Sequence, residues 1–211
     1  MRMFICGEWQ DRPEKIQIKN PYNGTVIDTV PKAGATDVER ALATLVSGAS
    51  VMRNMTAYDR SQILRRAATL MQAREKDLGR TISSEEGKIL AEGIFEASRA
   101  RETIDISADE AKRIDSEVVP LDAAPGAKGK FGFTIRVPCG IVAAITPFNF
   151  PLNLVAHKLA PAIAAGCSMV LKPAPQTPLS ALLLAEAVQQ AGWPDGALNV
   201  LPAYRRSARE R

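Results

Sequence analysis

The stretch ITPFNFPLNLVAHKLAPAIAAGCSMVLKPAPQTPLS, residues 145–180, decides the fold predicted for this chain of 211 residues. The run that leads into it, GIVAAIT, is continuously apolar and β-branched, which is typical of a buried parallel strand. Apolar side chains then recur at helical spacing until Gly166 ends the helix, namely Leu152, Val155, Leu159 and Ile163. SMVLK is a second buried strand, and PLSALLLAEAVQQAG and ALNVLP add a second helix and a third strand. The order β-α-β-α-β predicts an α/β fold with half of a doubly wound, Rossmann-like parallel sheet.

The residues before this unit predict short strands followed by helices. MFICGEW is a short strand, and Asn23-Gly24 lies between two β-rich arms, which predicts an N-terminal β-hairpin. One helix is predicted to start at a capping box, residues 36–39, and a second at Thr56, with a stripe that extends to Leu78. A third is predicted from about Ile89 to Ile114, and the charges of these helices are interpreted as solvated faces. A Pro/Gly/Ala connector and a strand, FGFTIRVP, then lead to the parallel unit.

Composition excludes several classes of protein. The net charge of +4 comes mostly from the end of the chain, YRRSARER, so nucleic-acid binding is not expected elsewhere, and a role for this tail in binding nucleic acid ranks low. Cys6, Cys139 and Cys167 are widely spaced without a C-x-x-C, so neither a disulfide framework nor a metal site is expected, and a reducing cytoplasmic location fits. No signal peptide and no apolar stretch of about 18–20 residues is present, so no membrane association is expected.

Polar side chains follow two neighbouring strands of the predicted sheet. Residues 146–149 come directly after the first strand and residues 172–176 after the second, at the edge where parallel α/β sheets bind ligands. Lys172 could donate to a ribose or a phosphate, and the Asn149 amide could stabilise negative charge developing on an oxygen. Pro147 and Pro151 restrict the backbone around Asn149. Two structural alternatives stay open, because Asn149 could simply cap the helix and Lys172 could be a solvated charge. No G-x-G-x-x-G is present.

The segment VPCGIVAAITPFNFPLNLVAHKLAPAIAAGCSMVLKPAPQTPLSALLLAEAV closely resembles the NAD(P)-dependent aldehyde dehydrogenase superfamily. GEW, NPYNGTVIDTVPKA, RSQILRRAATLM and EEGK extend the resemblance to roughly residues 4–203, the N-terminal, cofactor-binding portion of that family. It implies strands and helices of the cofactor-binding domain over 1–120, a connector and oligomerisation-type strand over 121–137, and a partial Rossmann-like unit over 138–203. The remaining segment, 204–211, is expected to be a disordered basic tail.

The resemblance also implies residue roles. Asn149 would be the catalytic amide that stabilises the oxyanion, and Lys172 would bind the adenosine ribose or the 2′-phosphate of NADP. The other residues of the cofactor cleft would be Ile145, Thr146, Pro147, Phe148, Pro173, Ala174 and Pro175. Many NAD-preferring members carry a Glu three residues after the lysine, where this chain has Pro175, so the choice between NAD and NADP stays open.

Phe150, Leu154 and His157 match positions that line the substrate funnel of the family, along one side of a helix. His157 could contact a small hydroxylated or anionic aldehyde, and the alternative is a surface histidine packed on the helix.

In the family the nucleophilic Cys and the general base Glu come later than residue 211. Cys139 and Cys167 are not expected to replace the nucleophile, because a buried cysteine behaves as a small hydrophobe. The chain is therefore expected to be truncated and inactive alone, although its family oxidises aldehydes to carboxylic acids and forms homo-oligomers. The alternative is a non-catalytic nucleotide-binding or interaction fragment that associates with full-length relatives.

Overall fold

The predicted β-α-β-α-β unit is present in the computed structural model, which describes residues 1–204. Its elements are β7 (Ile141–Ile145), α5 (Asn153–Ala164), β8 (Ser168–Lys172), α6 (Leu179–Gln190) and β9 (Leu198–Val200). Strand β8 lies between β7 and β9 and is parallel to both. The register places Ile145 opposite Lys172, so the carboxyl ends of β7 and β8 meet at one edge of the sheet.

The N-terminus of the chain completes the sheet on one side. Strands β1 (Met3–Ile5) and β2 (Glu8–Gln10) form a hairpin, and β1 pairs antiparallel with β9 to give the order β2-β1-β9-β8-β7. Cys6 and Gly7, in the turn, both have positive φ, of 56° and 82°, and the glycine meets this requirement without steric cost. The sheet is thus mixed, and β7 forms an outer edge of it among the described residues. The hairpin predicted around Asn23-Gly24 is confirmed as a separate two-stranded sheet of β3 (Lys15–Lys19) and β4 (Val26–Pro31).

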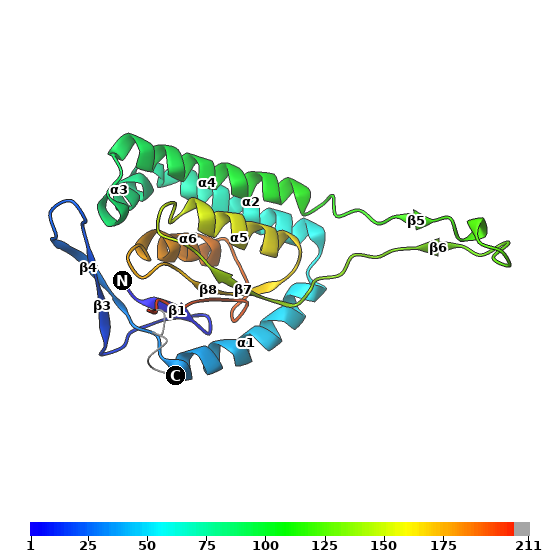
Figure 1. Cartoon of the computed structure of the whole chain (residues 1–211), viewed down its shortest axis with the longest axis horizontal. Coiled ribbons are helices and arrows are strands. Elements are labelled where there is room, and N and C mark those ends of the chain that lie inside the picture. Colours follow the sequence, from blue (N-terminus) through cyan, green and yellow to red (C-terminus); the bar gives the residue numbers. More distant parts are fainter. Residues whose placement is uncertain (205–211) are drawn as a thin grey trace.

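The helices form layers on both sides of this sheet (Figure 1). Helix α1 (Ala35–Asn54) covers one face, where it contacts β8 and β9, and α5 and α6 cover the other face. Helices α2 (Ala57–Ala73), α3 (Glu75–Glu86) and α4 (Leu90–Glu110) form a further layer over α5 and α6. One large apolar core runs through sheet and helices, so α5 and α6 are packed on both sides.

Helix starts were predicted with mixed success. Thr56 caps α2 as expected, because its side chain accepts a hydrogen bond from the Asp59 backbone N–H. The capping box at residues 36–39 was wrong, since α1 starts at Ala35 and the Asp37 carboxylate accepts from the Gly34 N–H at 3.1 Å. Leu78 does not belong to the stripe of α2, because that helix ends before Arg74 and Leu78 lies in α3.

Helices α3 and α4 cross at backbone contact. A Cβ on Gly93 would lie 2.5 Å from the Gly79 carbonyl oxygen, so only glycine fits there. The crossing is close enough to bring the end of α3 and the first turns of α4 over the N-terminal ends of α6 and α5, where both helices supply polar side chains.

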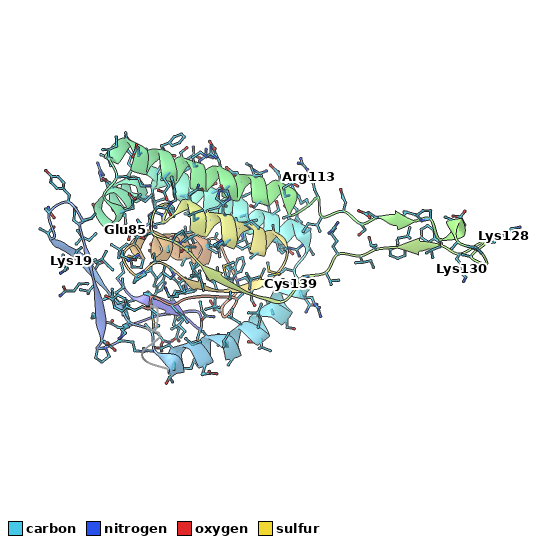
Figure 2. All side chains as sticks on the ribbon, viewed as in Figure 1. Lys19, Glu85, Arg113, Lys128, Lys130 and Cys139 are labelled. Carbon is cyan, nitrogen blue, oxygen red and sulfur yellow. The ribbon has the colours of Figure 1, made fainter. Side chains whose placement is uncertain are left out.

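An arm projects from the body between α4 and β7 (Figure 1). It contains β5 (Val118–Val119), a 3-10 turn (Leu121–Ala123) and β6 (Gly132–Phe133), with β5 and β6 antiparallel. The strand predicted for FGFTIRVP is therefore formed only at Gly132–Phe133. Lys128 and Lys130 lie at the tip of the arm (Figure 2).

None of the described helices is long and apolar enough to cross a membrane. No group of three or more His, Cys, Asp or Glu side chains that could hold a metal ion occurs within residues 1–204. The basic tail predicted for 204–211 lies, except for Tyr204, outside the described residues.

Candidate cofactor edge and active-site loop

The carboxyl ends of β7 and β8 bring two of the predicted site segments together. The Thr146 N–H donates to the Lys172 carbonyl oxygen at 3.2 Å, which continues the pairing one residue past β7. The Lys172 side chain is half-buried, and burial lowers the pKa of its ammonium group. Its Nζ donates to the Pro173 carbonyl oxygen at 3.3 Å, and no carboxylate within residues 1–204 pairs with it. The ammonium therefore keeps donors available for an anionic ligand.

A cleft of about 470 Å³ opens at this edge. Phe148 and Pro175, two of the predicted cofactor residues, line it together with side chains from β3, the end of α3 and Tyr204. The other predicted residues of this edge differ in exposure: Thr146, Pro173 and Ala174 are buried, whereas Ile145 and Pro147 are exposed. The hydroxyl oxygens of Thr146 and Thr177 are buried without a hydrogen-bond partner among the described residues.

Asn149 lies in an exposed loop and does not cap α5. The structural alternative considered for this residue is therefore wrong. The helix begins after Leu152, whose N–H donates instead to Glu96 Oε1 of α4 at 2.9 Å, as does the Asn153 N–H at 3.0 Å. Since the cap is supplied by another helix, the Asn149 amide is left free for a different role.

A buried ion pair holds the backbone of the Asn149 loop. Lys88 Nζ lies 2.7 Å from Glu96 Oε2, and both side chains are almost completely buried. The same Nζ donates to the Asn149 carbonyl oxygen at 3.0 Å and lies 4.3 Å from the centroid of the Phe150 ring, a cation–π contact. Glu96 fixes the start of α5, and Lys88 fixes the backbone of Asn149, for which the family resemblance predicts a catalytic role. The ion pair therefore pre-organises the loop.

Glu85, at the end of α3, caps the N-terminus of α6 as Glu96 caps that of α5. Its carboxylate accepts from the N–H groups of Leu179 and Ser180 at 2.7 and 2.9 Å, and from the Ser180 hydroxyl. Burial raises the pKa of Glu85 to about 7, against the hydrogen bonds from Ser180 and Leu179, which lower it. Figure 2 shows Glu85 at the end of the body away from the arm.

Two arginines of α2 complete the pattern at the opposite helix ends. Arg60 Nε donates to the Ala164 carbonyl oxygen at the end of α5, and Arg66 Nε donates to the Ala191 carbonyl oxygen at the end of α6. Each of the two helices thus has a carboxylate at its N-terminus and a guanidinium at its C-terminus, the signs that the helix dipole favours. The layer α2–α4 fixes both helices that follow the candidate site strands.

The predicted substrate residues lie along one face of the start of α5. The Leu154 N–H donates to the Phe150 carbonyl oxygen at 3.0 Å, which gives this turn helical spacing and places Phe150, Leu154 and His157 on one side. Phe150 and His157 are exposed and Leu154 is half-buried. The face is open to solvent within the described part of the chain.

Sequence reasoning missed Glu85, Lys88 and Glu96, and the interpretation of all helix charges as solvated was wrong. The signal was present in the spacing. Glu85 continues the buried series Leu78, Ile82 at helical intervals, and Glu96 lies on the same buried face as Gly93 and Ala100. A glutamate on an apolar stripe needs a partner in the interior, and here the partners are helix N-termini.

The chain is similar in sequence to proteins of known function. The profile of the aldehyde dehydrogenase family matches residues 9–211. The chain is 44% identical over 200 residues to a 3-sulfolactaldehyde dehydrogenase of Priestia aryabhattai, covering 94% of this chain and 41% of that protein. It is 43% identical over 200 residues to an NADP(+) succinate-semialdehyde dehydrogenase of Escherichia coli strain K12, with the same coverage of 94% and 41%.

Among solved structures, aldehyde dehydrogenase 21 from Physcomitrella patens, in complex with the reaction product succinate, superposes with a TM-score of 0.94 at 37% identity. The superposition covers 97% of this chain and 43% of that one. The chain thus spans about two fifths of the length of the relatives that it matches. With a family profile that covers nearly all of its residues, the chain belongs to the aldehyde dehydrogenase family.

Proposed function

We propose that this chain is the cofactor-binding portion of an NAD(P)-dependent aldehyde dehydrogenase, which oxidises an aldehyde to a carboxylic acid. The observation that carries the proposal is the pairing of Ile145 with Lys172, which sets the Asn149 loop and the lysine at one edge of the sheet. The family and the open cleft beside Phe148 and Pro175 support the same assignment.

The residues at this edge fit a nicotinamide dinucleotide. Lys172 has no carboxylate partner within residues 1–204, so its ammonium would donate to the ribose or to a 2′-phosphate. Pro175 offers neither charge nor side-chain acceptor, which removes the repulsion that a carboxylate there would exert on a 2′-phosphate. Both NADP and NAD are therefore proposed, and the bound nicotinamide would accept the hydride of the aldehyde.

The Asn149 amide would donate to the oxygen of the aldehyde as negative charge develops on it. The Asn149 backbone does not need to reorganise for this. Lys88 already donates to the Asn149 carbonyl oxygen, and Glu96 already accepts from the N–H at the start of α5. The remaining reacting groups of the family would have to come from beyond the described residues.

The substrate proposed is a short aldehyde that carries a second, acidic group. The two relatives named above act, by their names, on 3-sulfolactaldehyde and succinate semialdehyde, which bear a sulfonate and a carboxylate. Exposed His157, on the face shared with Phe150 and Leu154, is the candidate for a contact to such a group.

Replacing Lys172 by alanine is expected to weaken NADP binding by about 10- to 100-fold, since a charge-assisted hydrogen bond contributes about 1.5–3 kcal/mol. Calorimetric titration of the purified chain with NADP and with NAD measures this directly, and NADP should lose more affinity than NAD if the lysine meets the 2′-phosphate. Lys158→Ala removes an exposed lysine of α5 and should leave both affinities unchanged. Equal NADP affinity of the wild-type and Lys172→Ala proteins would show that the lysine has another role.

We also propose that the arm binds a second subunit, either another copy or a full-length relative. Its large apolar side chains are exposed on a thin hairpin that cannot bury them, among them Val118, Phe131, Phe133, Ile135 and Val137. This observation also favours the second candidate function, an interaction fragment.

The double variant Phe131→Ser/Phe133→Ser is expected to shift the chain to a lower association state, because the tilted pair of rings, 5.9 Å apart, would supply much of the apolar contact. Sedimentation velocity over a range of concentrations measures the shift. Lys130→Ser, which changes the same arm without removing apolar area, serves as the control. An unchanged distribution of species in the double variant would place the association surface elsewhere.

A further inference from the structure

Two cysteines meet at the amino-terminal side of the parallel strands, away from the candidate cofactor edge. Cys139 Sγ and Cys167 Sγ lie 3.5 Å apart, although 28 positions separate them in the chain. Cys139 comes just before β7 and Cys167 just before β8, and these strands pair from Ile141 and Ser168 onward. Figure 2 shows Cys139 where the arm joins the body, whereas Glu85 lies at the far end.

The backbone holds this pair in place. Gly140 and Gly166, each next to one of the cysteines, have φ of 100° and 78°, conformations that L side chains rarely adopt. The Ser168 N–H donates to the Gly140 carbonyl oxygen at 3.0 Å, and the Cys167 N–H donates to the Ala162 carbonyl oxygen at 2.9 Å. The two thiols are thus brought together by the start of the sheet, and closing the remaining gap to a bonding distance of about 2 Å needs side-chain rotation.

The two thiols differ in access. Cys167 is buried as expected, but the burial expected for Cys139 was wrong, because its side chain is exposed. Burial together with the Cys139 thiol raises the pKa of Cys167. The backbone N–H groups of Gly140 and Cys139, which lie close to the Cys167 sulfur, act in the opposite direction. Arg60, whose Nε donates to the Ala164 carbonyl oxygen at the end of α5, is a charged neighbour of this sulfur. An exposed thiol beside a buried one is the arrangement of a peroxide-reactive cysteine and its resolving partner.

We propose that Cys139 and Cys167 form a redox modification site, in which hydrogen peroxide converts the two thiols to an intramolecular disulfide. The Cys139 thiolate attacks one peroxide oxygen, the O–O bond breaks, and a sulfenic acid and water result once a proton is taken up. The Cys167 sulfur then displaces the hydroxyl of the sulfenic acid, which leaves as a second water. Overall two thiols are oxidised, one peroxide is reduced to two waters, and a thiol reductant reverses the change.

The test treats the folded full chain with stoichiometric hydrogen peroxide, blocks the remaining thiols with an alkylating agent in denaturant, and maps tryptic peptides by mass spectrometry. Trypsin cuts after Lys158, which separates Cys139 from Cys167, so the disulfide appears as a cross-link between two peptides. We expect this cross-link, with the mass loss of about 2 Da that disulfide formation requires. It should exceed any cross-link to half-buried Cys6 by roughly tenfold or more, because only the native pair is in contact.

Two variants extend the test. Cys167→Ser should leave Cys139 as a sulfenic acid that a dimedone probe traps, and Cys139→Ser should leave Cys167 alkylatable after the same treatment. A wild-type protein that gains oxygen on Cys139 while Cys167 remains a free thiol would overturn the proposal. So would a Cys139–Cys167 yield in the folded protein no higher than in protein oxidised in denaturant.

Discussion

Replacing Glu96 by glutamine is expected to lower the free energy of unfolding by about 3–5 kcal/mol, the usual cost of removing one partner of a buried ion pair. Two physical losses combine. The Lys88 ammonium would lose its nearer counter-charge and keep only the Glu86 carboxylate, 3.8 Å away, and the N–H groups of Leu152 and Asn153 would lose a charged acceptor. Urea denaturation of the wild-type and variant chains, followed by circular dichroism, measures the difference.

A matched control lies on the same helix. Glu102 is about half exposed and its carboxylate is 4.0 Å from Arg99, so Glu102→Gln should change the free energy of unfolding by less than about 0.5 kcal/mol. If Glu96→Gln stayed within about 1 kcal/mol of the wild type, the ion pair would not be what secures the start of α5. The same variant should also weaken the hold on the Asn149 loop, which would be seen as faster amide exchange there.

The free energy of unfolding is expected to fall by about 3 kcal/mol as the pH rises from about 4.5 to above 7, because of Glu85. Its pKa is raised from an ordinary value of 4.5 to about 7 in the fold, so the folded state holds more protons than the unfolded state between these values. Such a group stabilises the fold fully below its unfolded pKa, and the contribution is lost as the pH rises through the folded pKa.

Urea denaturation at several pH values between about 5 and 8 tests this dependence. Glu85→Gln, which cannot ionise, should flatten the curve over this range, whereas Glu39→Gln on the exposed face of α1 should leave it as in the wild type. A curve of the same slope in Glu85→Gln would assign the pH dependence to other groups.

Local patterns in the sequence were sufficient for the parallel unit. The strands β7, β8 and β9 and the helices α5 and α6 all lie where apolar runs, glycine stops and proline starts predicted them. These apolar and Gly/Pro patterns depend only on residues within a few positions of each other. They therefore predict helices and strands without knowledge of the fold. The sequence predicted that β7 and β8 are neighbours but not their register. The structure shows that Ile145 pairs with Lys172.

Contacts between residues that are distant in the chain could not be predicted from local patterns. Nothing near Met3–Ile5 indicates that this strand pairs with β9, almost two hundred residues later. Nor does any local pattern indicate that Glu96 caps a helix beginning at Asn153, or that Cys139 touches Cys167. Pairing of strands brings β1 to β9 and the two cysteines to each other. The Glu96 contact forms because α4 packs onto α5, and the cost of burying a carboxylate favours a helix N-terminus as its partner.

The sequence by itself determined the α/β class, the order of the strands and helices in the parallel unit, and the two segments that end at one edge of the sheet. The sequence was sufficient here because the spacing of apolar residues and the backbone preferences of Gly and Pro are properties of a single helix or strand. Only the tertiary structure decided what fixes that edge: a buried Lys88–Glu96 pair behind Asn149, Glu85 at the start of α6, and the N-terminal hairpin on β9. A buried charge needs a partner of opposite charge or a hydrogen bond. Its partner is set by the packing of elements that are distant in the sequence, so local sequence patterns do not reveal it.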